Sequence, residues 1–106
     1  MNDNQREMMR HALGLTSGNQ PIIVNNKRCV CSYRNHYNIY KECSDYNEWT
    51  ELVTQGLAEI NARSAEYFHC TYAGATAVIG QNEFLSTEDF PQASGTVFEV
   101  VKKRRS

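Results

Sequence analysis

The sequence predicts an α+β fold in which two helices pack on a small antiparallel sheet. Two segments, 4–13 and 45–55, carry apolar residues at helical spacing between a capping residue and a glycine. Short stretches rich in β-branched and aromatic residues lie between and after these segments. The chain has 106 residues, which is a common size for one domain.

We expect a single domain over residues 1–101 and a basic tail, 102–106, without fixed structure. The expected order is helix, hairpin, strand, helix and then two or three more strands. A helix followed by a C-terminal hairpin is also typical of winged-helix proteins. A winged-helix-like arrangement is therefore an alternative, although the sequence pattern predicts no third helix.

The first helix is predicted from a cap, an apolar stripe and a stop. Asn4 is the expected N-cap, and Glu7, three residues on, is its partner in a capping box. Gly14 suits the left-handed position after the helix, and Leu15 can then fold back onto its apolar side. The stripe consists of Met8, Met9, Ala12 and Leu13.

A β region follows the first helix. Residues 21–24 are apolar and β-branched, and Asn25 and Asn26 suit a tight turn because asparagine tolerates positive φ. Residues 28–41 are rich in tyrosine, valine and cysteine with partial alternation. We expect a hairpin across the two asparagines and then a further strand.

The second helix has the clearest pattern. Asp45 is the expected N-cap with Glu48 at the capping-box position, Gly56 is the stop, and Leu57 can pack back on the helix. Its apolar face consists of Tyr46, Trp49, Leu52 and Val53.

The remaining chain is read as mainly extended. Residues 57–60 and 66–72 are predicted strands, and 96–101 is a predicted last strand before the tail. Residues 86–89 suit a helical turn that Pro91 disturbs. The small apolar segment 73–80 has no assignment.

Composition indicates a globular protein of the cytoplasm. Hydrophobic residues make up 41% of the chain and charged residues 22%. No apolar run approaches the length of a membrane span, and no secretory signal is recognisable. We therefore expect no membrane association, and the four cysteines are expected as thiols or metal ligands in a reducing compartment.

Charge is strongly segregated along the chain. Residues 1–41 hold six basic and two acidic residues, whereas 42–101 hold ten acidic residues against Arg63 alone. Residues 102–105 are all basic. Such asymmetry bears on binding partners and not on fold.

Zinc binding and nucleophilic catalysis are minor hypotheses for this sequence. Cys29, Cys31, Cys43, His69 and Cys70 are allowed zinc ligands, but their spacing does not match structural zinc sites. No nucleophile elbow, Walker loop or zinc-protease helix occurs, so an enzyme hypothesis rests only on Cys70 or His69. We expect no enzyme and no cofactor.

Three segments carry a resemblance. They are Arg-Glu-Met-Met-Arg-His-Ala-Leu-Gly-Leu at 6–15, Tyr-Arg-Asn at 33–35 and Trp-Thr-Glu-Leu-Val-Thr-Gln-Gly-Leu at 49–57. Together they resemble a group of small phage and prophage proteins without assigned function, over about residues 5–60. The resemblance implies a phage or prophage origin and brings no catalytic residues with it.

The leading functional hypothesis is a non-catalytic phage-type accessory protein, such as an anti-CRISPR-like inhibitor, that binds and blocks a host or defence-system protein. An acidic surface able to occupy a nucleic-acid-binding groove motivates it, and interfaces are also enriched in tyrosine and arginine. The candidate partner-binding residues are Arg34, Tyr37, Tyr40, Glu48 and Glu51.

The alternative is a small nucleic-acid-binding or transcription-regulating protein of winged-helix-like form. It would use Arg28, Arg34, Lys41 and the basic tail on phosphates, with tyrosines as stacking platforms. The two hypotheses differ in surface potential. A broad acidic face favours the inhibitor, and a continuous basic groove favours the nucleic-acid binder.

Overall fold

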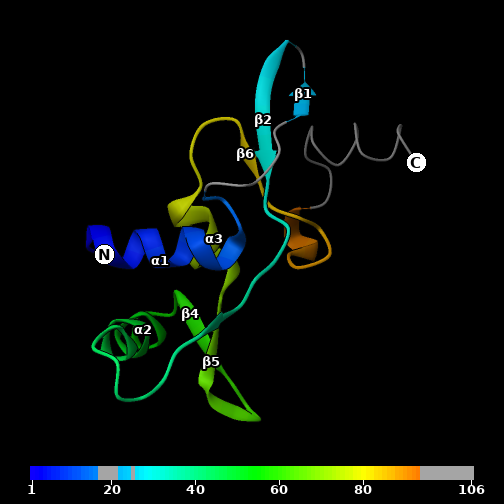
Figure 1. Cartoon of the computed structure of the whole chain (residues 1–106). Coiled ribbons are helices and arrows are strands. Elements are labelled where there is room, and N and C mark those ends of the chain that lie inside the picture. The colour runs from blue at the N-terminus through cyan, green and yellow to red at the C-terminus, as the bar shows by residue number, and fades with distance from the viewer. Residues whose placement is uncertain (17–21, 25, 94–106) are drawn as a thin grey trace.

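The computed structural model describes residues 1–16, 22–24 and 26–93 and confirms the α+β class (Figure 1). In chain order the described elements are α1 (Asp3–Leu13), β1 (Ile22–Val24), β2 (Lys27–Cys31), β3 (Tyr37–Asn38), α2 (Asp45–Thr54), β4 (Ala58–Asn61), β5 (Ser64–Cys70), α3 (Tyr72–Val78), β6 (Glu83–Phe84) and a short 3-10 turn (Pro91–Ala93). The predicted strand at 96–101 and the tail lie outside the described residues.

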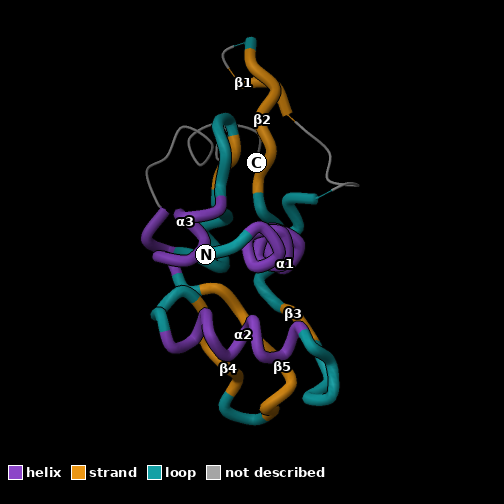
Figure 2. The backbone as a smooth tube through the Cα atoms, turned by 90° about the vertical axis from the view of Figure 1, so that its left-hand side faces the viewer, coloured by secondary structure: helices purple, strands orange, loops and turns teal. Residues whose placement is uncertain are grey.

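The strands form two small sheets, with α1 between them. One has the order β1-β2-β6 and the other β3-β5-β4. Figure 2 shows α1 nearly end-on, with the β1–β2 hairpin above it and α2 with the β3-β5-β4 sheet below. The predicted single antiparallel sheet is therefore wrong in two respects, because the strands divide and β2 pairs with β6 in parallel.

The sheets divide because α1 interrupts the predicted strand over 28–41. The amides of Tyr33 and His36 donate to the carbonyls of Leu13 and Ala12, each over 3.2 Å. These carbonyls belong to the last turn of α1 and have no partner within the helix. Residues 32–36 consequently run along α1 and separate β2 from β3.

A winged-helix arrangement is not shown. A third helix, α3, is present, but it follows the β4–β5 hairpin in the chain and contacts α1. Its N-terminus is capped by Thr71, whose hydroxyl accepts a hydrogen bond from the Gly74 amide over 3.1 Å. The sequence prediction left this segment unassigned because its small residues have no apolar period.

The first helix starts two residues earlier than predicted. Asn2, and not Asn4, is the N-cap, and it exchanges hydrogen bonds of 2.7 and 3.0 Å with Gln5 in a capping box. Both asparagines suit the motif in sequence, but the earlier start also buries Gln5. The predicted stop is confirmed, since Gly14 has a φ of 76° and the Leu15 amide donates to the Arg10 carbonyl.

The second helix is confirmed, with a changed N-terminus. Ser44 occupies the N-cap position without a side-chain cap bond, and Asp45 is the first helical residue. At the other end, Gly56 has a φ of 76° and the Leu57 amide donates to the Leu52 carbonyl over 2.9 Å. This is the predicted left-handed ending.

Gly56→Ala tests this ending. An alanine Cβ would meet no atom within 4 Å, so the change introduces no clash. We expect a loss of about 1 kcal/mol in the free energy of unfolding, because alanine is strained at positive φ. Urea denaturation of the two proteins measures it, and a more stable variant would mean that α2 continues through this position.

Aromatic stacking joins α2 to the β3-β5-β4 sheet. The rings of Trp49 on α2 and Phe68 on β5 are stacked at 5.5 Å, and Tyr46 meets Phe68 edge-on at 5.3 Å. Trp49 and Leu52 are fully buried, as the helical stripe predicts. The α1 stripe enters the same core, so one apolar cluster ties α1 and α2 to the sheet.

An ion pair joins α1 to the β1-β2-β6 sheet. The guanidinium of Arg10 binds both carboxylate oxygens of Glu83 on β6, over 2.6 and 2.7 Å. Their side chains are 23% and 14% exposed, so solvent screens the pair only in part. The same guanidinium donates to the Val78 carbonyl at the end of α3.

We expect stability to fall in acid through this pair. The hydrogen bond from Arg10 lowers the pKa of Glu83 below its ordinary value of 4.5. A lowered folded-state pKa contributes stability above the unfolded pKa, and this is lost as pH falls through the folded value. Glu83→Gln should cost about 1–3 kcal/mol at pH 7 and make stability less pH-dependent below about pH 4.5. Denaturation curves at a series of pH values measure this. A difference in the free energy of unfolding between wild type and variant that does not change with pH would contradict the role of the ion pair.

Within the described residues, none of the helices is long and apolar enough to cross a bilayer.

Candidate binding groove

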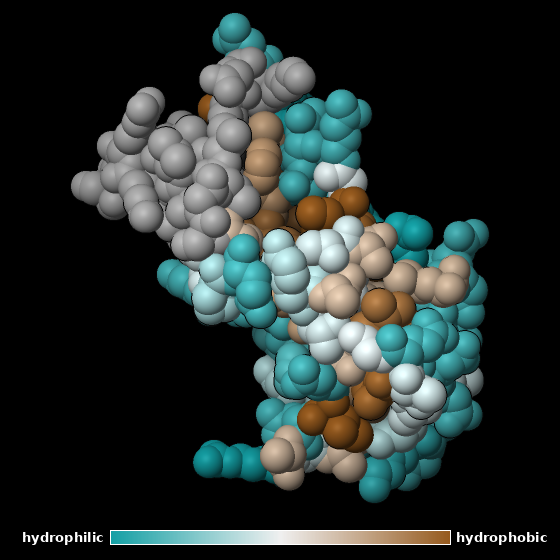
Figure 3. All heavy atoms as spheres, turned by 180° about the vertical axis from the view of Figure 1, so that it is seen from behind, coloured by the Kyte–Doolittle hydropathy of each residue, from teal (hydrophilic) through white to brown (hydrophobic). Residues whose placement is uncertain are grey.

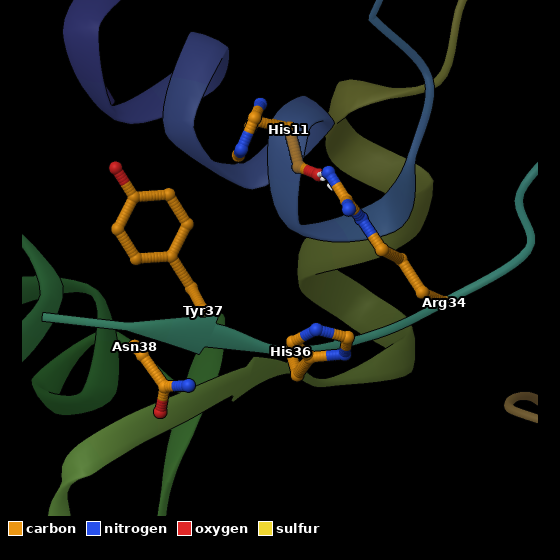
Figure 4. Close-up of a pocket in the computed structure, with 5 residues that line it drawn as sticks. All are labelled: His11, Arg34, His36, Tyr37 and Asn38. Carbon is orange, nitrogen blue, oxygen red and sulfur yellow. Dashed lines mark hydrogen bonds between the residues drawn. The ribbon is translucent and has the colours of Figure 1, made fainter. Parts of the chain in front are cut away.

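Two neighbouring hollows lie between α1 and the segment 33–38, with volumes of about 310 and 560 Å³. They share His11, Arg34 and Tyr37 in their walls, and we call the pair the α1 groove. Figure 4 shows the smaller hollow, which His36 and Asn38 complete. The larger hollow is completed by Asn4, Glu7, Met8, Thr16, Tyr33 and Asp45.

The groove exists because an extended segment is bonded to the C-terminal turn of a helix. The hydrogen bonds from 33 and 36 to α1 hold this segment beside His11. Asn35 holds it from the other side, since its side-chain amide exchanges bonds of 2.9 and 2.8 Å with the Cys70 backbone. The groove wall is thus fixed to both α1 and β5.

Tyr37 is the aromatic centre of the groove. Its ring lies 5.1 Å from Trp49 and meets His11 edge-on at 5.8 Å. Burial, followed by the negative charge of Asp45, raises the pKa of Tyr37 above 10.0. The phenol therefore stays protonated at neutral pH and can donate a hydrogen bond.

Arg34 is held rigidly at the end of α1. Its Nε and Nη2 atoms donate to the His11 carbonyl over 3.1 and 2.7 Å (Figure 4). Its guanidinium carbon also lies 5.3 Å from the centre of the Tyr33 ring. A cation at a helix C-terminus is favourable because the macrodipole is negative there.

His36 lines the smaller hollow beside Arg34. Its ring stacks on Tyr67 with centroids 5.8 Å apart. Burial, followed by the negative charge of Glu88, raises the pKa of Asp89, and His36 opposes this rise. The smaller hollow is thus lined by the nitrogen-bearing side chains of His11 from α1 and of Arg34 and His36 from the facing segment (Figure 4).

The structure brings together two of the five predicted binding residues. Arg34 and Tyr37 share the groove, whereas Tyr40 is 71% exposed and lines a separate hollow with Ile39 and Glu66. That hollow has a volume of about 440 Å³ and is also lined by Asn38 and Ser64.

The two predicted acidic residues lie on α2 outside the groove. Glu48 accepts a hydrogen bond from the Asn2 side chain over 3.1 Å, which joins it to the α1 cap. Glu51 is exposed and contacts the Gln55 side chain one turn on. Charge reversal at Glu48 therefore removes a bond between helices, while Glu51 is the cleaner position for changing charge alone.

Sequence reasoning missed His11, His36, Glu7 and Asp45 as groove residues. They come from three segments that only the fold brings together, and each suits an ordinary surface or cap position in sequence. The available signal was the helix stop at Gly14 followed by the Tyr-Arg-Asn stretch, which places an arginine near a helix C-terminus.

The predicted cations do not gather in the described part of the chain. Arg28 lies on β2, Arg34 lies beside α1, and Lys41 lies between β3 and α2. Figure 1 shows β2 at the top of the molecule and the segment before α2 at the bottom. Exposed large apolar side chains are likewise scattered, and the face seen in Figure 3 has small apolar patches between polar residues.

Cys70 and His69, on which an enzyme hypothesis would rest, lie in different surroundings. Cys70 is buried, and burial raises the pKa of its thiol to about 12, so it stays protonated at neutral pH. His69 instead contacts Glu59 on β4 over 3.2 Å. Across the described residues, no group of three histidine, cysteine, aspartate or glutamate side chains could hold a metal ion.

Comparisons with protein-family models, curated proteins and solved structures found no match to this chain. The resemblance to phage and prophage proteins therefore stays a prediction.

Proposed function

We propose that this protein is a non-catalytic, phage-type accessory protein that binds and blocks a host or defence-system protein through the α1 groove. The observation that carries the proposal is a groove that contains two side chains held by other parts of the fold. Tyr37 packs on Trp49, and Arg34 donates a hydrogen bond to the His11 carbonyl. Tyrosine and arginine are enriched among the residues that dominate interface energies. Held side chains also lose little conformational entropy on binding.

Mixed charge favours a protein partner over a nucleic acid. The groove contains Arg34 and two histidines, but also the carboxylates of Glu7 and Asp45. Phosphates along a strand would meet these carboxylates as like charges, which is unfavourable. Protein surfaces, in contrast, offer both signs of charge.

Photo-crosslinking in a bacterial host lysate tests the proposal. Tyr33→p-benzoylphenylalanine places the crosslinker on a 62% exposed groove residue, and Ile60→p-benzoylphenylalanine is the control on β4, at the other edge of the sheet from β3. We expect a protein adduct from position 33 and none of the same mass from position 60. Unlabelled wild type should compete, and Arg34→Gln should compete about tenfold less well.

Two results would overturn the proposal. One is an adduct that disappears on nuclease treatment, which indicates a nucleic-acid partner. The other is the same protein adduct from both positions, which indicates contact without use of the groove. Melting curves of each variant establish that the fold is retained.

A further inference from the structure

The charges of the α1 groove are sorted by position. The smaller hollow has His36 as its own basic residue, and the larger hollow has Glu7 and Asp45 as its own acidic residues. His11, Arg34 and Tyr37 belong to both, so they lie at the junction. Figure 4 shows Arg34 and Tyr37 on opposite sides of His11, so we call the side of the groove with Arg34 and His36 its basic portion and the side with Glu7 and Asp45 its acidic portion.

The basic portion retains hydrogen-bond donors for a ligand. Arg34 uses Nε and Nη2 on a neutral carbonyl, and its Nη1 has no hydrogen-bond partner among the described residues. Its guanidinium also forms no ion pair with a described carboxylate, in contrast to Arg10. Arg34 is the one arginine or lysine among the residues that line the smaller hollow. A planar guanidinium fixed in this way suits a carboxylate.

The acidic portion can accept a cation. Asp45 uses Oδ1 on the Asn4 side chain over 3.1 Å, which orients the carboxylate and leaves Oδ2 available. Glu7 is exposed on α1, one turn beyond Asn4. Neither carboxylate forms an ion pair with a described residue.

We infer that the groove takes an extended segment of the partner protein that carries both charges. An acidic side chain lies against Arg34, a basic side chain lies against Glu7 and Asp45, and an apolar or aromatic residue between them packs on Tyr37. This inference rests on the proposed function and adds the chemistry of the partner. A groove between a helix and an extended segment fits a single extended chain.

A random peptide display library of about twelve residues, selected on the full-length protein, is the probe. We expect enriched peptides to contain an acidic and a basic residue separated by an apolar or aromatic one. Selection on Arg34→Gln should lose the acidic preference, and selection on Glu7→Gln with Asp45→Asn should lose the basic preference. Each loss should correspond to at least about tenfold weaker binding of the best wild-type peptide. Glu51→Gln is the control, because it removes an acidic charge outside the groove.

Several outcomes would overturn the inference. They are enrichment of peptides with one sign of charge, preferences that survive the groove substitutions, and no enrichment over the bare support. Failure here is distinguishable from failure of the proposed function. A nuclease-resistant adduct specific to position 33 together with a negative peptide selection rejects only the two-charge segment. Thermal melts of each variant exclude loss of fold as the cause.

Discussion

Gly74→Ala is expected to destabilise the protein by about 3 kcal/mol or more, at the upper end of overpacking effects. An alanine Cβ at this position would lie 1.9 Å from the Leu57 carbonyl oxygen and 2.8 Å from the Met9 side chain. The oxygen belongs to backbone that also accepts the Thr71 amide, so it cannot move without breaking this bond. The helix would have to shift away from the end of α2.

Urea denaturation of Gly74→Ala against wild type measures this effect, with Thr76→Ala as the control. Thr76 is exposed on the same helix, and alanine has the higher helix propensity, so the control should be neutral or slightly stabilising. Since Gly→Ala in an exposed helix normally stabilises by about 1 kcal/mol, an equally stable Gly74→Ala protein would show that α3 does not pack on Leu57.

Leu52→Ala is expected to cost about 2–5 kcal/mol, the usual range for a buried leucine. Its side chain is fully buried in the apolar cluster that joins α1, α2 and the β3-β5-β4 sheet. Glu51→Ala, one residue away on the exposed side of α2, should change the free energy of unfolding by no more than about 0.5 kcal/mol. Equal stability losses at the two positions would mean that the predicted helix face is rotated.

Local sequence signals predicted the helices with complete patterns. The stripe from Met8 to Leu13 and the glycines at 14 and 56 specify where helices lie and how they end, because caps and periodicity act within a few residues. The predicted N-caps, Asn4 and Asp45, were wrong by two residues and by one residue. Asn2 and Asn4 each have a glutamine or glutamate three residues on, and only packing of Gln5 distinguishes them.

Other parts of the fold depend on contacts distant in sequence. Helix α3 consists mainly of small residues, and Gly74 in its first turn disfavours a helix locally. The close approach of Gly74 to Leu57 explains the glycine. The division of the sheet depends on α1 carbonyls that bind Tyr33 and His36. No periodicity within the strand predicts such a bond.

The candidate site was predicted only in part for the same reason. Arg34 and Tyr37 were found because they stand in one tyrosine-rich stretch, whereas His11 and Asp45 reach the groove from separate helices. Glu48 and Glu51 share an α2 surface, as helical spacing requires, but they do not line the α1 groove.

The most direct test of the central claim is hydrogen–deuterium exchange of the protein bound to the partner that crosslinking identifies. We expect slower exchange over 32–38 and the last turn of α1, with unchanged exchange at the β4–β5 turn. Protection confined to the β4 edge or to the β1–β2 hairpin, with 32–38 unaffected, would contradict binding through the α1 groove.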